Sequence, residues 1–236
     1  MGTYLSNFAK GEKYIEVQEY QRGRFSGRYN EVFSFTDKNI PEDFVKENQF
    51  IFDVAETGWG YCIWKPFILL ECMNRIPDGD IIVYMDVADE VYNNDYFRWM
   101  ELHTLEHGRF LVWNYYTHAN WTKRDCFHYM DCDTEEYWNH RQLEAGTLAF
   151  VKNEENILFL RTWLNWCKVK EVMTKIPNIS GKENLPGFVD HRTDQSILTN
   201  LAIREGYVGE YMENVRAYIK YNEFEKGMEL TKHRYG

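Results

Sequence analysis

The chain has 236 residues, 44% of them hydrophobic, and a formal net charge of −10 at pH 7. No apolar run reaches the 18 or more residues that span a bilayer, and so acidic a chain lacks the clustered basic side chains that bind nucleic-acid phosphates. These features argue against membrane-spanning and nucleic-acid-binding classes and favour one soluble domain over residues 1–236.

Apolar runs typical of strands alternate with helical patterns along the chain. This alternation predicts an α/β fold in which helices flank a central sheet. In chain order, we expect a strand at 32–35, helices at 41–49 and 65–75, a strand at 81–85, a helix at 95–106, strands at 110–115 and 143–151, and helices at 154–169 and 191–205. The stretch 175–190, with two prolines and two glycines, is expected to be a loop and a candidate lid.

The five cysteines are odd in number, scattered and without CxxC spacing. The sequence therefore predicts reduced thiols in a cytoplasmic compartment, with neither a zinc site nor a disulfide framework. The acidic balance also constrains ligands. A diphosphate bound by this chain would need a divalent cation or a few well-placed donors to offset the charge repulsion.

Carboxylates follow the apolar strand at 81–85 directly, as Asp86, Asp89 and Glu90. A strand buried on both faces delivers such groups to the crevice where open α/β sheets bind ligands. Asp86 and Asp89 could share one hard cation, Mn²⁺ or Mg²⁺, which takes oxygen ligands. The alternative is that Asp86 caps the next turn while the other two carboxylates are solvated.

Several separated segments resemble, in the same order, a family of bacterial and viral sugar transferases. They are a Gly-Tyr-x-x-Trp-Lys-Pro segment within 58–68, Asp-Gly-Asp with its strand and aspartate within 77–86, and the segments 121–125, 142–146 and 191–198. The resemblance covers nearly the whole chain. It implies a GT-A fold and a glycosyltransferase that moves a sugar from a nucleotide-diphosphate donor, UDP-sugar by preference, to a glycan or glycoprotein acceptor.

The metal site departs from the common Asp-x-Asp pattern of this fold, because the chain carries Asp86-Val87-Ala88-Asp89. Asp86 occupies the family position and is the expected ligand of Mn²⁺ or Mg²⁺. Asp89 or Glu90 is the second ligand or a neighbour of it. His233 lies in a segment that resembles a family tail returning to the site, which makes it a candidate third ligand; a disordered terminus is the alternative.

The donor is expected to contact the start of the helix at 65–75 and the first strand. A helix N-terminus offers unpaired N–H groups and a positive dipole end to a diphosphate, and Lys65 adds a positive charge there. The neighbouring Tyr61 and Trp64 are expected to contact the donor as well. The alternative packs the Lys65 stem on Trp64. Phe8 lies where the family's first strand holds the nucleotide base, although a phenylalanine there is also typical of the core.

Asp194 and Gln195 begin the helix at 191–205. The pair is similar to one in glycogenin-like transferases that lies beside the transferred sugar, so Asp194 is the candidate carboxylate nearest the anomeric carbon and Gln195 a donor contact. The alternative is an N-cap, worth about 0.5 to 2 kcal/mol, or an acid of the first turn that stabilises the helix dipole.

Two further segments mix polar groups in a way suited to sugars. In 121–125, Asp125 is expected to accept sugar hydroxyls as a second candidate catalytic residue, with Lys123 or Arg124 on phosphate. The alternative is a surface helix start with an intrahelical charge pair. Glu144 begins a strand and is expected to contact sugar or acceptor.

Two other functions fit the same fold. A sugar nucleotidyltransferase normally carries a Gly-rich, basic loop after its first strand, whereas residues 6–11 hold one glycine. A non-catalytic carbohydrate-binding module would keep the pocket without turnover.

Overall fold

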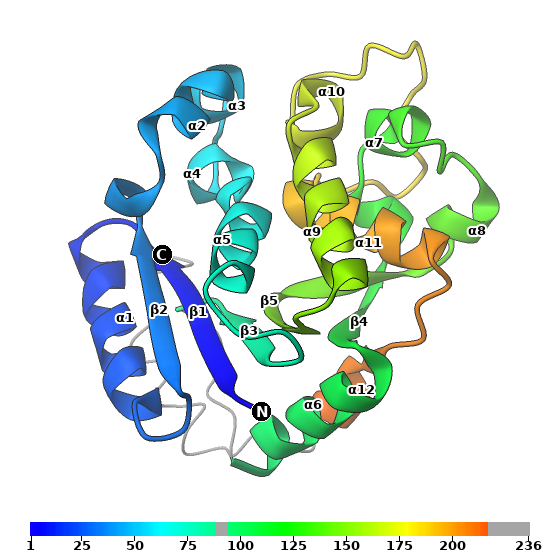
Figure 1. Ribbon diagram of the computed structural model, residues 1–236. Helices are drawn as coiled ribbons and strands as arrows, with labels where there is room; N and C mark the ends of the chain where they lie inside the picture. The colour runs from blue at the N-terminus through cyan, green and yellow to red at the C-terminus, as the bar shows by residue number, and fades with distance from the viewer. Residues whose placement is uncertain (88–93, 217–236) are drawn as a thin grey trace.

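The computed structural model describes residues 1–87 and 94–216. In these ranges one mixed sheet of six strands forms the centre of the molecule, in the spatial order β2-β1-β3-β5-β4-β6 (Figure 1). The strands are β1 (Thr3–Ala9), β2 (Glu31–Thr36), β3 (Ile81–Met85), β4 (Arg109–Thr117), β5 (Arg141–Val151) and β6 (Glu210–Tyr211). β1 pairs in parallel with β2 and β3, β5 runs antiparallel to β3 and β4, and β6 runs parallel to β4.

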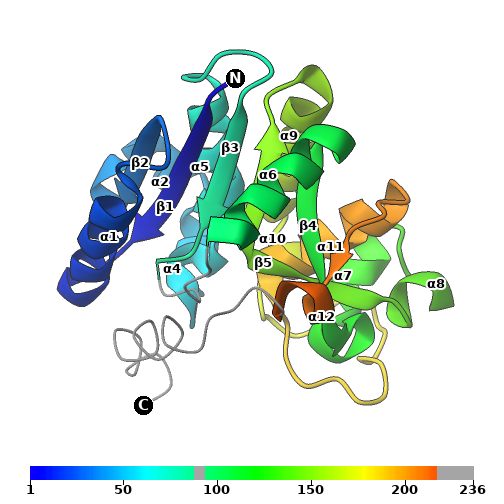
Figure 2. The ribbon, with the colours of Figure 1, turned by 90° about the horizontal axis from the view of Figure 1, so that it is seen from below.

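Helices cover both faces of this sheet (Figures 1 and 2). On one face lie α1 (Glu12–Phe25), α6 (Asn94–His107) and α12 (Met212–Arg216); on the other lie α5 (Trp64–Met73), α9 (Glu154–Cys167) and α11 (Thr193–Arg204). The shorter elements are η1 (Asp37–Asn39), α2 (Glu42–Glu47), α3 (Gln49–Asp53), α4 (Gly58–Tyr61), η2 (His118–Trp121), α7 (Arg124–Tyr129), α8 (Glu135–Trp138) and α10 (Lys170–Met173). None of the described helices combines the length and apolarity needed to cross a membrane.

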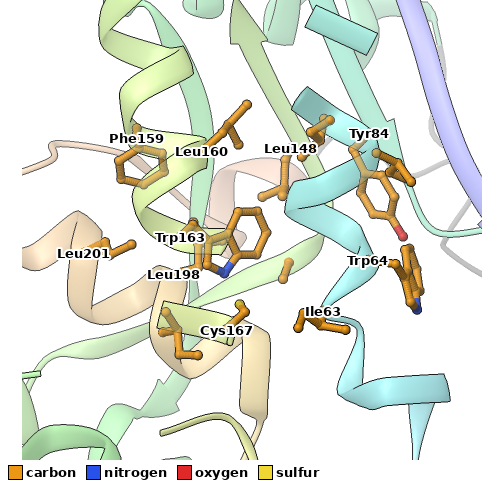
Figure 3. Close-up of a cluster of buried hydrophobic side chains, with 14 of the residues drawn as sticks. Ile63, Trp64, Tyr84, Leu148, Phe159, Leu160, Trp163, Cys167, Leu198 and Leu201 are labelled. Carbon is orange, nitrogen blue, oxygen red and sulfur yellow. The ribbon is translucent and has the colours of Figure 1, made fainter. Parts of the chain in front are cut away.

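Strand β3 joins the two halves of the hydrophobic core. All five of its residues are buried. Because side chains alternate along a strand, Ile82 and Tyr84 pack on the α5 and α9 side, whereas Val83 packs on the α1 and α6 side. Figure 3 shows part of the core on the α5 and α9 side of the sheet, where Trp163 of α9 lies among Leu148, Leu160 and Leu198.

The order of the strands creates a switch point beside β1. The chain leaves β1 through α1 to reach β2 on one side, then returns through α5 to β3 on the other side. The carboxyl ends of β1 and β3 therefore lie next to each other, and open α/β sheets bind ligands in the crevice outside such a point. Asp86 is the first residue beyond β3.

The mixed central sheet flanked by helices confirms the predicted α/β fold class. The predicted strands and the helices at 65–75, 95–106, 154–169 and 191–205 are present with small shifts in their ends, and 175–190 is a loop.

One prediction of secondary structure was wrong, and one long helix was missed. The expected helix at 41–49 is split into α2 and α3, because Asn48 leaves helical geometry (φ −112°, ψ 20°) and its amide Nδ2 donates to the carbonyl of Phe44. Helix α1 was not predicted at all. Its buried face includes the amides Gln18 and Gln21, so the hydrophobic repeat that marks a helix is weak.

Candidate functional site

Asp86 marks the centre of the site at the end of β3. Its backbone N–H donates to the carbonyl of Gly146 in β5 at 2.8 Å. The hydroxyl of Tyr84 donates to its carboxylate oxygen Oδ1, and burial followed by the charge of Asp86 raises the pKa of Tyr84 well above its usual value, which keeps that hydroxyl a donor. The Asp86 side chain is 24% exposed, so the carboxylate is held by its neighbours yet partly accessible to solvent.

Lys65 extends from α5 toward several oxygen atoms. Its ammonium nitrogen Nζ donates to the carbonyl of Ala145 at 2.9 Å and lies 3.4 Å from Asp194 Oδ2 and 3.7 Å from Asp86 Oδ1. Burial by itself lowers the pKa of this lysine, but the two carboxylates outweigh burial and raise it. Lys65 is therefore a buried, charged link between the end of β3 and the start of α11.

Asp194 lies in the first turn of α11 and is 6% exposed. The N-cap of that helix is Arg192, so Asp194 is not the capping residue, but as an acid of the first turn it lies where a carboxylate stabilises the helix dipole. The indole Nε1 of Trp163 donates to the Asp194 carbonyl at 2.9 Å and fixes the backbone. Burial raises the carboxyl pKa while Lys65 lowers it, and the net direction is upward.

Glu144 and Gln195 follow next among the predicted site residues, and hydrogen bonds to neighbouring residues hold both side chains. Glu144 Oε1 accepts from the backbone N–H groups of Ala145 and Gly146 at 3.2 and 3.1 Å, and its Oε2 accepts from Asn114 at 2.8 Å. Gln195 donates to Gln142 Oε1 at 3.0 Å. The structure thus brings Asp86 and Asp194 together around Lys65. Glu144 precedes Ala145, whose carbonyl binds Lys65, and Gln195 follows Asp194 in the chain.

The predicted metal ligands are only partly covered by the described residues. Asp86 offers carboxylate oxygens of the kind that Mn²⁺ and Mg²⁺ prefer, and one such carboxylate with phosphate oxygens and water is a common magnesium site. Within residues 1–87 and 94–216, no group of three or more His, Cys, Asp or Glu side chains is arranged to hold a metal ion. Asp89, Glu90 and His233 lie outside the described residues.

The aromatic residues expected to contact the donor belong to the core in this structure. The ring of Phe8 is stacked on Trp64, with centroids 3.8 Å apart, and on Trp59 at 5.7 Å. Tyr61 is buried, and its hydroxyl donates to the carbonyl of Val54 at 2.7 Å. Base stacking on Phe8 and donor contact by Tyr61 and Trp64 stay predictions.

The start of α5 is likewise occupied by its own chain. A left-handed turn at Gly60 (φ 64°) and Cys62 (φ 66°) precedes it, and a side chain at Gly60 would meet the ring of Phe52. The backbone N–H of Lys65 donates to the carbonyl of Cys62 at 2.9 Å. The ammonium group of Lys65, which we expected to bind phosphate, lies instead beside the carboxylates of Asp86 and Asp194.

Asp125 and Lys123 hold the 175–190 loop. Asp125 is fully buried, and its carboxylate accepts from the N–H groups of Ile179 and Ser180 at 2.8 and 3.2 Å and from the Ser180 hydroxyl. Lys123 Nζ donates to the carbonyl of Ile176 at 2.9 Å. Their expected contacts with sugar and phosphate stay predictions. In this structure both side chains fasten the candidate lid to α7.

Sequence reasoning missed two groups of buried polar side chains near the site. One is His118, Thr122, Gln142, Ser196 and Asn200, which are fully buried and linked by hydrogen bonds. The other is Asn7, Gln18 and Gln21 behind Asp86. Asn7, an amide in the middle of the first strand, was the available signal, because a buried amide is retained only where its hydrogen bonds are made.

Comparisons with known proteins add a distant likeness. The sequence matches no model of a protein family, and no curated protein matches it. Among solved structures, the apo form of mouse xyloside xylosyltransferase 1 is similar over 92% of this chain and 94% of its own, at 10% identity and a TM-score of 0.43. No residue's role rests on a likeness this remote.

Proposed function

We propose that the chain is a glycosyltransferase that moves a sugar from a nucleotide-diphosphate sugar, preferably a UDP-sugar, to a glycan or glycoprotein acceptor. The observation that carries the proposal is the link from Asp86 through Lys65 to Asp194, with Nζ 3.7 and 3.4 Å from their carboxylate oxygens. Two carboxylates from distant parts of the chain meet at the carboxyl edge of a mixed sheet, beside its switch point, where ligands of such folds bind. The motif resemblance predicts the same pair.

Each residue of the group has a distinct task in this proposal. Asp86 would hold a manganese or magnesium ion, which when bound would supply positive charge to neutralise a departing nucleoside diphosphate. Asp194 faces the sugar, where its negative charge stabilises positive charge developing at the anomeric carbon or accepts the proton of the acceptor hydroxyl. Glu144 and Gln195 orient sugar hydroxyls by hydrogen bonds.

Lys65 positions the two carboxylates and leaves them ready for their separate tasks. Its single charge balances only part of two carboxylates, so the edge retains a negative charge that favours a divalent cation. A buried lysine with several oxygen partners also holds these partners in fixed positions, and catalysis of group transfer requires such preorganisation.

The alternatives have less support. The segment between β1 and α1 is Lys10-Gly11, too short for the basic, Gly-rich loop of a sugar nucleotidyltransferase. A non-catalytic sugar-binding module would bind the donor without cleaving it, so turnover separates it from the transferase.

A thermal-shift panel tests ligand class directly. UDP, GDP, ADP and CDP are compared, each with and without Mn²⁺. A ligand present at 100 times its dissociation constant should add about 2.7 kcal/mol of stability. We expect one diphosphate, UDP first, to raise the melting temperature only with the metal. No shift with any of the four would count against the proposal.

A further inference from the structure

Three buried amide side chains lie behind the carboxyl ends of β1 and β3. Asn7 of β1 is 0% exposed, and Gln18 and Gln21 of α1 are 4% and 7% exposed. A buried amide is costly unless its hydrogen bonds are made, and apolar residues would pack here without that cost. We name these three residues the amide relay.

The relay runs from β2 to the residue after β3. Gln18 Nε2 donates to the carbonyl of Phe35 at 2.8 Å and to Asn7 Oδ1 at 2.9 Å. Asn7 Nδ2 donates to Gln21 Oε1 at 2.6 Å, and Gln21 Nε2 donates to the carbonyl of Asp86 at 3.3 Å. Every bond passes between different elements, so α1 is tied to three strand ends at once.

The direction of the relay is fixed by its two ends. The carbonyl oxygens of Phe35 and Asp86 can only accept, so each must face an NH₂ group. Turning the Gln21 amide over would bring its oxygen against the Asp86 carbonyl and its NH₂ against that of Asn7. One arrangement therefore satisfies all the donors and acceptors along the path, as in a cooperative network.

Asp86 is consequently held on both sides of its backbone. Its N–H donates to Gly146 of β5, and its carbonyl accepts from Gln21 of α1. We propose that Gln21 is a positioning residue that fixes the backbone of Asp86 and thereby aims its carboxylate into the crevice. This inference rests on the proposed function, since it takes Asp86 to be the residue that binds the cation.

Two matched variants separate positioning from packing. Gln21→Met and Gln18→Met each replace one buried amide of the relay by an apolar side chain of similar length, and both should lower the melting temperature. Gln21 donates to the carbonyl of Asp86, whereas Gln18 donates to Phe35 and Asn7. Loss of a group that orients a metal ligand typically weakens metal binding by about 10- to 100-fold, so Gln21→Met should show that loss and Gln18→Met should not.

The first readout is the dissociation constant of Mn²⁺ alone, measured on the full chain by electron paramagnetic resonance. The second is the hydrogen-exchange rate of the Asp86 amide, which needs no ligand and should rise in Gln21→Met relative to Gln18→Met. If Gln21→Met fails to fold, Gln21→Asn keeps the amide chemistry but shortens the reach, and it should show the same two changes.

The outcomes distinguish this inference from the proposed function. Unequal Mn²⁺ affinity and unequal exchange in the two variants support Gln21 as a positioning residue; equal values in both measurements overturn it. A wild-type chain that binds no Mn²⁺ contradicts the metal part of the proposed function. The exchange rate of the Asp86 amide then decides the inference on its own.

Discussion

Lys65 and Asp194 form a buried ion pair that joins helix α5 to helix α11, with Nζ 3.4 Å from Oδ2. The same ammonium lies 3.7 Å from Asp86, so one charge organises two carboxylates that are 108 residues apart in sequence (194 − 86).

Removing the charge of Lys65 should destabilise the fold. Lys65→Met leaves Asp86 and Asp194 without their shared cation, and breaking a buried pair typically costs about 3 to 5 kcal/mol. Urea denaturation measures the free energy of unfolding. Lys46→Met, which removes an exposed helix pair with Glu42, is the control and should change stability by less than about 0.5 kcal/mol. Equal losses in the two variants would show that the Lys65 cluster contributes no more than a surface pair.

Asp86 should be needed for metal binding and for turnover. Asp86→Asn keeps the volume of the side chain but removes its charge. We expect weaker Mn²⁺ binding and turnover below a tenth of the wild-type value, a loss of more than about 1.4 kcal/mol in transition-state stabilisation. Asp43→Asn on the exposed side of α2 is the control for loss of one carboxylate. An Asp86→Asn variant with more than a tenth of normal activity would show that Asp86 is not a metal ligand.

Stability should fall at mildly acidic pH because two buried histidines are neutral. Burial lowers the pKa of His118 and His191 from 6.5 to about 3. His191 donates from Nε2 to the carbonyl of Val172 and accepts at Nδ1 from the N–H of Lys123, so a second ring proton has no acceptor.

The sign follows from proton uptake by the unfolded chain. Above pH 6.5 the two histidine rings are neutral in both the folded and the unfolded chain. Between pH 6.5 and about pH 3, the rings take up a proton only in the unfolded chain. Unfolding free energy should therefore drop by about 2 kcal/mol per histidine between pH 7.5 and pH 5. His191→Gln should lose about half of that drop. An identical pH dependence in wild type and variant would contradict the role given to His191.

Asp125 should hold the 175–190 loop closed against α7. Asp125→Ala removes the acceptor for Ile179 and Ser180, so trypsin should cut faster at Lys182, an exposed residue of that loop. Glu183→Ala, an exposed neighbour in the same loop, is the matched control. Unchanged cleavage rates in Asp125→Ala would mean that other contacts hold the loop.

The sequence predicts the site best where a local pattern carries the information. The apolar strand 81–85 followed by Asp86 is such a pattern, because it places a carboxylate at a sheet edge whatever the rest of the chain does. Asp194 was reached differently, through an ordered set of motifs that resemble a known family.

What sequence reasoning missed depends on contacts between distant residues. The carbonyl that binds Lys65 belongs to Ala145, 80 residues away, and nothing near either residue indicates the pairing. Lys123 and Asp125 illustrate the same limit: their charges suggested a ligand, whereas the described fold supplies partners from the loop at 176–180. Helix α1 was missed because amides occupy half of its buried face.

The most direct test of the central claim is release of nucleoside diphosphate from nucleotide sugars by the wild type and by Asp194→Asn. A panel of UDP-, GDP-, ADP- and CDP-sugars is incubated with Mn²⁺, and the melting temperature of each protein is recorded alongside. We predict release from one donor class by the wild type and a loss of about 100-fold or more in Asp194→Asn with its fold intact, because the carboxylate acts on the reacting sugar. Normal release by Asp194→Asn, or no release from any donor by the wild type, would contradict the account.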